Sequence, residues 1–224
     1  MSRPDIRAVL FDLDGTLLDT APDLVHALNE VRREQRLAPV PFEVARTQVS
    51  HGSSGLIRLG FPQLSGQPLE TLRLRLLEFY SANLAHGTQL FDGCQQVLDE
   101  LARRQMRWGI VTNKPAFLTI PLLATLKLDA LASCVVSGDT LPERKPHPAP
   151  VQHAAGLLHL APAHCLYVGD AERDVQSARA AGMPVLVARY GYLGPDDDPV
   201  SWKPDAHIDS PLQILQWLDG VLAA

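Results

Sequence analysis

The sequence predicts an α/β protein in which a doubly wound parallel sheet carries an inserted helical domain. Short apolar runs of strand length alternate with helix-length segments over most of the chain, as in sheets whose parallel strands are joined by helices. One long stretch, residues 19–87, shows helical periodicity with no convincing strand. The length of 224 residues suits one core with a smaller insert.

Five short apolar runs are expected to form the sheet. The first is followed by an Asp-Gly-Thr turn signal, which predicts a buried strand ending in a tight loop. Apolar residues at helical spacing between the later runs predict helices that cover both faces of the sheet. The five runs are residues 6–13, 108–112, 134–136, 165–168 and 185–187.

Residues 19–87 are expected to form the inserted helical domain, so that the core comprises residues 1–18 and 88–224. Leucines at helical spacing, such as Leu24 and Leu28, indicate amphipathic helices. The expected hinges lie after residue 18 and around Gly87, a residue that can absorb backbone rotation.

Charge and cysteine content exclude several classes of protein. With 20 Lys and Arg against 25 Asp and Glu, the net charge of −5 offers no basic field for a nucleic acid. The three cysteines form no CxxC pair, which argues against a disulfide framework or a zinc site and favours a reducing compartment. The apolar run nearest the N-terminus has four residues, too few for a signal peptide or a membrane span. We therefore expect a cytoplasmic protein that binds neither nucleic acid nor membranes.

The strongest functional signal is Asp12-Leu13-Asp14-Gly15-Thr16, directly after the first strand. Like charges buried together are costly unless a cation compensates them, so the two carboxylates suggest a divalent metal. Gly15 allows a tight turn, and the amides that follow could bind an anion. An Asp-Gly pair alone would be read as a turn with Asp14 as a cap. Two acids together with Thr16 after an apolar strand favour a functional site.

Further polar groups follow later strands, at the sheet edge where ligands bind in such folds. Asp170 and Asp174 are four residues apart and would face one ion if the segment becomes helical. Taken singly, each is better explained as an acid at a helix N-terminus. Thr112 and Lys145 suit a phosphoryl oxygen, although alone they would be a turn residue and a solvated charge.

Taken together and in this order, these four groups resemble the motifs of the haloacid dehalogenase superfamily of phosphotransferases. The resemblance covers essentially the whole chain and implies a Rossmann-like core with a helical cap. It implies that Asp12 is the nucleophile that forms an aspartyl-phosphate and that Asp14 is the general acid and base. It also implies a Mg²⁺ ion held by Asp12, the Asp14 backbone carbonyl and Asp170, with Asp174 holding the metal's waters or neighbouring groups.

The resemblance assigns the phosphoryl group to three polar side chains, Thr16, Thr112 and Asn113. Lys145 would neutralise that group and restrain the nucleophile. In the cap, the loop 50–55 is rich in glycine and hydroxyl groups. We interpret its His51 and Gly52, together with the nearby Arg58, as substrate contacts. An equally good reading makes the loop a helix connector, with Gly52 as a cap and His51 exposed.

Within the superfamily the chain resembles the phosphoglycolate phosphatases. Residues 111–115 and 188–192, with Trp202, are more similar to the N-acetylmuramic acid 6-phosphate phosphatases. The resemblance implies hydrolysis of a small phosphate ester, with N-acetylmuramic acid 6-phosphate from cell-wall recycling as the favoured substrate and phosphoglycolate as the alternative. A phosphoglucomutase-type isomerase and a noncatalytic binding protein are further alternatives. The predicted cap contains no lysine, which excludes the Schiff-base chemistry of the phosphonate-cleaving branch. The protein is expected to be a monomer or homodimer.

Overall fold

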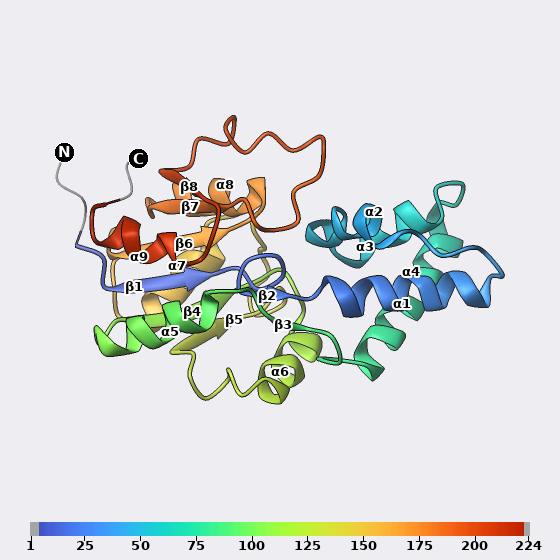
Figure 1. Ribbon diagram of the computed structural model, residues 1–224, viewed down its shortest axis with the longest axis horizontal. Coiled ribbons are helices and arrows are strands. Elements are labelled where there is room, and N and C mark those ends of the chain that lie inside the picture. The colour runs from blue at the N-terminus through green and yellow to red at the C-terminus, as the bar shows by residue number, and fades with distance from the viewer. Residues whose placement is uncertain (1–4, 222–224) are drawn as a thin grey trace.

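The computed structural model, which describes residues 5–221, contains a six-stranded parallel sheet (Figure 1). The strand order is β5-β4-β1-β6-β7-β8, and every neighbouring pair is parallel. All five runs predicted to be strands are strands, whereas β8 was not predicted. The strands are β1 (Ala8–Phe11), β4 (Arg107–Val111), β5 (Cys134–Val136), β6 (Cys165–Gly169), β7 (Val185–Ala188) and β8 (Ala206–Ile208).

The chain order of the strands creates a switch point beside β1. From β1 the chain moves outward on one side through β4 and β5, then returns to the other side of β1 with β6 and continues to β8. The carboxyl ends of β1 and β6 therefore lie next to each other, with Phe11 opposite Val168. Ligands bind at such a point in doubly wound sheets, because the loops leave in opposite directions there.

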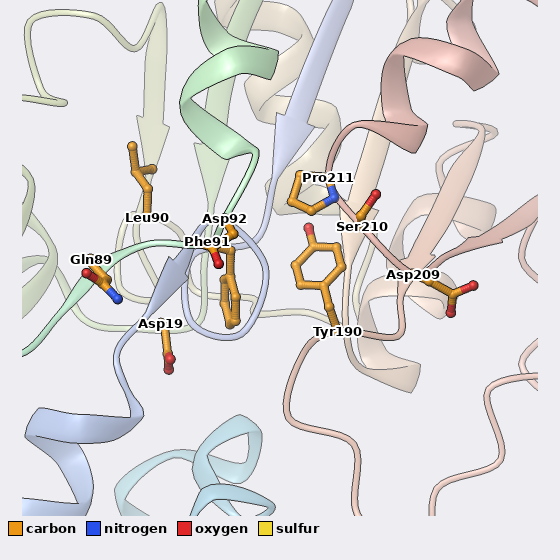
Figure 2. A pocket seen from close by; sticks show the side chains of 9 residues that line it. All are labelled: Asp19, Gln89, Leu90, Phe91, Asp92, Tyr190, Asp209, Ser210 and Pro211. Carbon is orange, nitrogen blue, oxygen red and sulfur yellow. The ribbon is translucent and has the colours of Figure 1, made fainter.

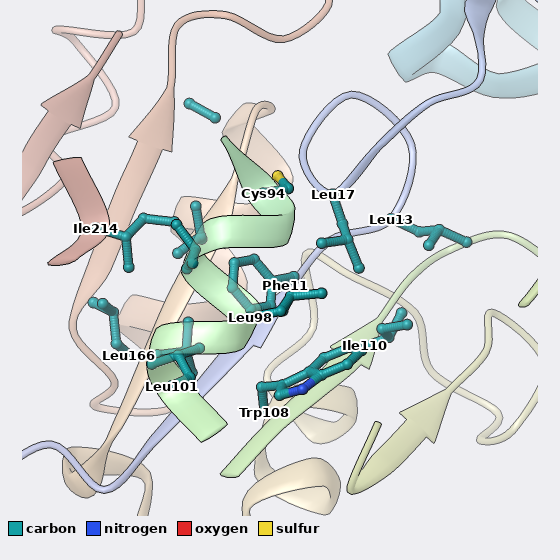
Figure 3. Close-up of a cluster of buried hydrophobic side chains, with 14 of the residues drawn as sticks. Phe11, Leu13, Leu17, Cys94, Leu98, Leu101, Trp108, Ile110, Leu166 and Ile214 are labelled. Carbon is teal, nitrogen blue, oxygen red and sulfur yellow. The ribbon is translucent and has the colours of Figure 1, made fainter. Parts of the chain in front are cut away.

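Helices cover both faces of the sheet, which confirms the predicted fold class. On one face α5 (Cys94–Arg103), α6 (Ala116–Thr125) and α9 (Gln213–Leu218) pack on the strands. On the other face lie α7 (Ala149–Leu157) and α8 (Glu172–Ala180). Figure 3 shows α5 directing Leu98 and Leu101 toward Phe11 and Trp108, whose rings meet edge to face with centroids 6.4 Å apart. This packing holds the strand ends in fixed positions.

A group of helices lies between two short strands, β2 (Leu18–Asp19) and β3 (Gln89–Leu90), which pair antiparallel. Figure 1 shows this helical segment to one side of the sheet. It contains α1 (Ala21–Glu34), α2 (Phe42–Arg46), α3 (Gly52–Gly60), α4 (Gly66–Ala82) and a 3₁₀ turn, Val49–His51. We keep the predicted boundaries of the two domains as a proposal. Residues 1–4 and 222–224 of the predicted core lie outside the described residues.

The helical segment has its own apolar core and is tied down at both ends. The core includes Leu28 and Leu76, which are fully buried. At its base, the Asp23 carboxylate accepts hydrogen bonds from the Gly87 N–H at 2.6 Å and from the Thr88 hydroxyl at 2.6 Å. The two chain connections to the core are thereby joined. Between residues 5 and 221, no helix is long and apolar enough to cross a bilayer.

Candidate active site

Asp12 is the first residue after β1 and occupies the switch point. Its N–H donates to the Val168 carbonyl at 2.9 Å, which places its carboxyl group beside the end of β6. The side chain is 4% exposed, and its Oδ1 lies 2.9 Å from Lys145 Nζ. Burial raises the pKa of Asp12, and the positive charge of Lys145 opposes that rise. The carboxyl group is thus held close to a cation and largely shielded from solvent.

Three carboxylates converge at the ends of β1 and β6. Asp12, Asp170 and Asp174 each bring one oxygen within 4.8 Å of the others, and all three are buried. Burial, with repulsion from the other two carboxylates, raises the pKa of Asp170 to about 7. A divalent cation would relieve this repulsion, and carboxylate oxygens are the ligands that Mg²⁺ takes in proteins. The donor set therefore fits Mg²⁺.

Asp170 is held by groups from three parts of the chain. The hydroxyl of Thr16 donates to its Oδ1 at 3.3 Å, while the Ser50 hydroxyl and the Tyr192 N–H donate to its Oδ2 at 2.6 and 3.0 Å. Gly15, whose φ is +85°, passes so close that a Cβ would collide with the Asp170 carboxylate. The turn predicted at Gly15 is thus shaped around this acid.

Lys145 is the fully buried cation at the centre of the site, with a side chain 0% exposed. Its ammonium contacts Asp12 Oδ1 at 2.9 Å and Asp174 Oδ1 at 2.7 Å, and donates to Tyr167 Oη and the Val111 carbonyl at 2.8 Å each. The other oxygen of Asp174 accepts the Ala171 N–H at 3.0 Å, at the start of α8. One oxygen of Asp174 therefore positions Lys145, and the other positions the start of α8.

Asp14 stands apart from the carboxylate cluster. Its Oδ1 accepts a hydrogen bond from the Thr20 hydroxyl at 2.6 Å and lies 2.8 Å from Lys114 Nζ. Its side chain is 19% exposed, the most of the four motif acids with Asp12 at 4% and Asp174 at 0%, and Asp170 buried. The two neighbouring aspartates of the first motif thus have different surroundings, which suits different chemical roles.

The second and third motifs are joined to each other through Asn113. Its side-chain amide donates to the Lys145 carbonyl at 2.9 Å, and its Oδ1 accepts the Lys145 N–H at 3.1 Å. Thr112 is buried, and its hydroxyl oxygen accepts the Lys114 N–H at 3.1 Å. The Asn113 side chain thus fixes the Lys145 loop, and its contact with a phosphoryl group stays a prediction.

A cavity of about 230 Å³ opens beside Asp170, between the core and the helical segment. His51 lines it and is exposed, whereas Gly52 begins α3 with a φ of +65°. Arg58 is exposed further along α3 and is not among the lining residues. The lining residues are Ser50, His51, Asp170, Ala171, Glu172, Arg173, Gln176, Tyr192 and Asp197.

A larger cavity, of about 310 Å³, lies between β3 and the residues that follow β7 and β8 (Figure 2). The rings of Phe91 and Tyr190, whose centroids are 5.1 Å apart, both line it. None of the three clustered carboxylates lines it, whereas Asp170 lines the smaller cavity. We therefore place the candidate active site at the smaller cavity.

Three residues of this site, Arg173, Lys114 and Tyr192, were missed by the sequence predictions, and Ser50 was expected only as part of the loop 50–55. Arg173 lies inside the fourth motif and brings its Nη2 to 3.9 Å from Asp12 Oδ2. Lys114 follows the second motif directly, so its position was a usable signal. Ser50 and Tyr192 meet Asp170 only through the fold, because each lies more than twenty residues from it along the chain.

The comparisons with known proteins agree with this geometry. The model of the haloacid dehalogenase-like hydrolase family matches residues 9–188, so the chain belongs to that family. A phosphoglycolate phosphatase of Xanthomonas campestris pv. campestris is 44% identical over 208 residues, covering 93% of this chain and 94% of the relative. An N-acetylmuramic acid 6-phosphate phosphatase of Pseudomonas putida is 37% identical over 220 residues, covering 97% and 98%.

A solved structure supports the same assignment. A predicted phosphoglycolate phosphatase from Haemophilus somnus superposes with a TM-score of 0.85 at 28% identity, over 96% of this chain and 99% of that one. With the family match and the relatives, the chain is an enzyme of the phosphatase class, as the four motifs predicted.

Proposed function

We propose that the protein is a Mg²⁺-dependent phosphomonoester hydrolase that works through an aspartyl-phosphate. The observation that carries the proposal is the buried arrangement of Asp12, Lys145 and Asp170 at the sheet switch point. Phosphoryl transfer depends mainly on positioning and on charge stabilisation, which a fixed lysine beside a fixed carboxylate supplies.

In this mechanism an oxygen of Asp12 forms a bond to phosphorus while the bond between phosphorus and the ester oxygen breaks. The leaving alkoxide takes a proton from Asp14. A water molecule then returns a proton to Asp14 and attacks phosphorus, which frees Asp12 and inorganic phosphate. Lys145 and Thr112 face the charge on the phosphoryl oxygens. When bound by Asp12, Asp170 and the Asp14 carbonyl, Mg²⁺ would neutralise negative charge on the phosphoryl group.

For the substrate we propose N-acetylmuramic acid 6-phosphate, with 2-phosphoglycolate as the second candidate. The first is supported by the Pseudomonas putida relative, which matches nearly the whole chain, and the second by the more identical Xanthomonas relative. Both esters carry a carboxylate. Arg173, in the cavity wall beside Asp12, offers that carboxylate a cationic partner.

The test is phosphate release from both esters and from simple hexose phosphates, with Mg²⁺ or with EDTA. Asp12→Asn should abolish turnover and leave the circular dichroism spectrum unchanged. Borohydride reduction of quenched enzyme should convert a phosphorylated Asp12 to homoserine, which mass spectrometry detects. Phosphate release that Asp12→Asn leaves intact would refute the mechanism, and an isomerised sugar phosphate without free phosphate would indicate a mutase.

A further inference from the structure

Lys114 is a buried cation to which the proposed mechanism gives no role. It lies in the loop after β4, and its N–H donates to the Thr112 hydroxyl oxygen, which fixes where the side chain starts. The side chain is 5% exposed. Burying an ammonium group is costly unless the group is paired, so the partners of Lys114 indicate the role of this side chain.

Those partners belong to two different parts of the molecule. Lys114 Nζ lies 2.8 Å from Asp14 Oδ1, and 4.5 Å from the centroid of the Tyr80 ring. Tyr80 belongs to α4 in the helical segment and is fully buried. The face of an aromatic ring attracts a cation, more strongly where water is excluded. Lys114 thus connects the helical segment to the acid of the first motif.

Thr20 completes the arrangement around Asp14. Its hydroxyl donates to the same Oδ1 that Lys114 contacts, at 2.6 Å. Two donors on one oxygen fix the rotation of the carboxyl group, which decides whether the other oxygen faces a leaving group. A misplaced catalytic group loses rate even where binding is unchanged.

We propose that Lys114 is a positioning residue for Asp14, and that Tyr80 makes this positioning depend on the helical segment resting on the core. The inference rests on the proposed function of Asp14 as the general acid. Tyr80 shares one apolar cluster with Leu118 of α6, the helix that begins two residues after Lys114. Docking of the segment and placement of the lysine therefore involve the same contact surface.

The test compares two kinds of leaving group. An alkyl phosphate needs a proton on its leaving oxygen, whereas p-nitrophenyl phosphate releases a weak base that needs little help. The rate compared is that of leaving-group release in a single turnover, which ends before the water step in which Asp14 is the base. Lys114→Met should lower this rate about 100-fold on whichever alkyl ester the wild type hydrolyses best, within the range for lost acid catalysis. On p-nitrophenyl phosphate the loss should stay below about fivefold, because Asp12 and Lys145 are untouched. Asp14→Asn should show the same pattern with a larger loss.

Variants of the ring test the second half of the proposal. Tyr80→Leu should lower the ratio of the alkyl to the p-nitrophenyl release rate about 10-fold. Tyr80→Phe, which keeps the ring, should leave this ratio close to that of the wild type. Phe61→Leu is the matched control, because Phe61 is another buried ring of the helical segment with a guanidinium 5.7 Å from its centroid. It should lower the melting temperature without changing the ratio. In the Lys114→Met background, Tyr80→Leu should change the ratio no further.

Equal losses on both esters in Lys114→Met, which would leave the ratio unchanged, would overturn the proposal. Lys114→Arg keeps the charge and should recover part of the ratio, so the proposal stays testable if Lys114→Met folds poorly. A wild type that hydrolyses alkyl esters with a ratio insensitive to Lys114 refutes only the positioning role. A wild type that releases no phosphate from any ester refutes the proposed function as well.

Discussion

Replacing Lys145 by methionine should destabilise the protein strongly, apart from its effect on turnover. The methionine keeps much of the side-chain volume but removes the only cation within 3 Å of Asp12 and Asp174 among the described ion pairs. Both carboxylates are buried, so each would be left without its partner. Breaking a buried pair in this way costs about 3–5 kcal/mol.

For a protein of this size, that loss lowers the melting temperature by about 6–20 °C. The assay is urea unfolding without metal, at pH 7.5, with circular dichroism as the signal. Adding Asp174→Asn to Lys145→Met should recover stability, because one of the two unpaired charges is removed. A loss below about 1 kcal/mol, or a double variant no more stable than Lys145→Met, would show that the buried ion pairs do not carry this energy.

Three further predictions follow from the site. Arg173→Ala should raise KM about 10- to 100-fold for a carboxylate-bearing ester and less for a sugar phosphate without a carboxylate, since a hydrogen bond to a charged group is lost. Equal effects on both esters would show that Arg173 does not bind the carboxylate. Without metal, the pKa of Asp170 is raised from 3.8 to about 7, so the folded protein holds a proton that the unfolded chain releases, and the melting temperature should fall as pH rises from 5 to 7.5. Mg²⁺ should weaken that fall, and a flat profile without metal would contradict the raised pKa of Asp170. Tyr192→Phe should cost about 1–3 kcal/mol in urea unfolding, because the Thr20 N–H, which donates to Tyr192 Oη at 2.6 Å, is left unpaired; an unchanged midpoint would refute this.

The strands that position the site could be predicted from the sequence, whereas most of the contacts around the site could not. Apolar runs such as that ending at Phe11 are short, continuous and buried on both sides, so their length and the turn signals beside them identify them as strands. The polar residues after them could be located because parallel strands end at one edge. β8 has a histidine in its middle and so lacks the unbroken apolar run that revealed β5, which has the same length. β2 and β3 have only two residues each, which is too short for any pattern.

The surroundings of each acid could not be predicted in the same way. Asp14 meets Lys114 across one hundred residues of sequence, and Asp170 meets Ser50 across one hundred and twenty. Such pairings depend on how loops from separate strands and helices pack, which no local pattern encodes. The sequence therefore indicated the three carboxylates and the lysine that the fold brings together, but not that Asp14 is separated from them.

The antiparallel pair β2–β3 brings both ends of the helical segment to one point of the core. Because the chain leaves and returns at adjacent positions, a segment of different length or shape could join the same two strands without moving β1 or β6. Substitutions in the cavity wall contributed by this segment, apart from Ser50, which holds Asp170, would change the shape of the cavity without moving Asp12 or Lys145. The architecture thus allows substrate range to diverge by exchange of one continuous piece of chain.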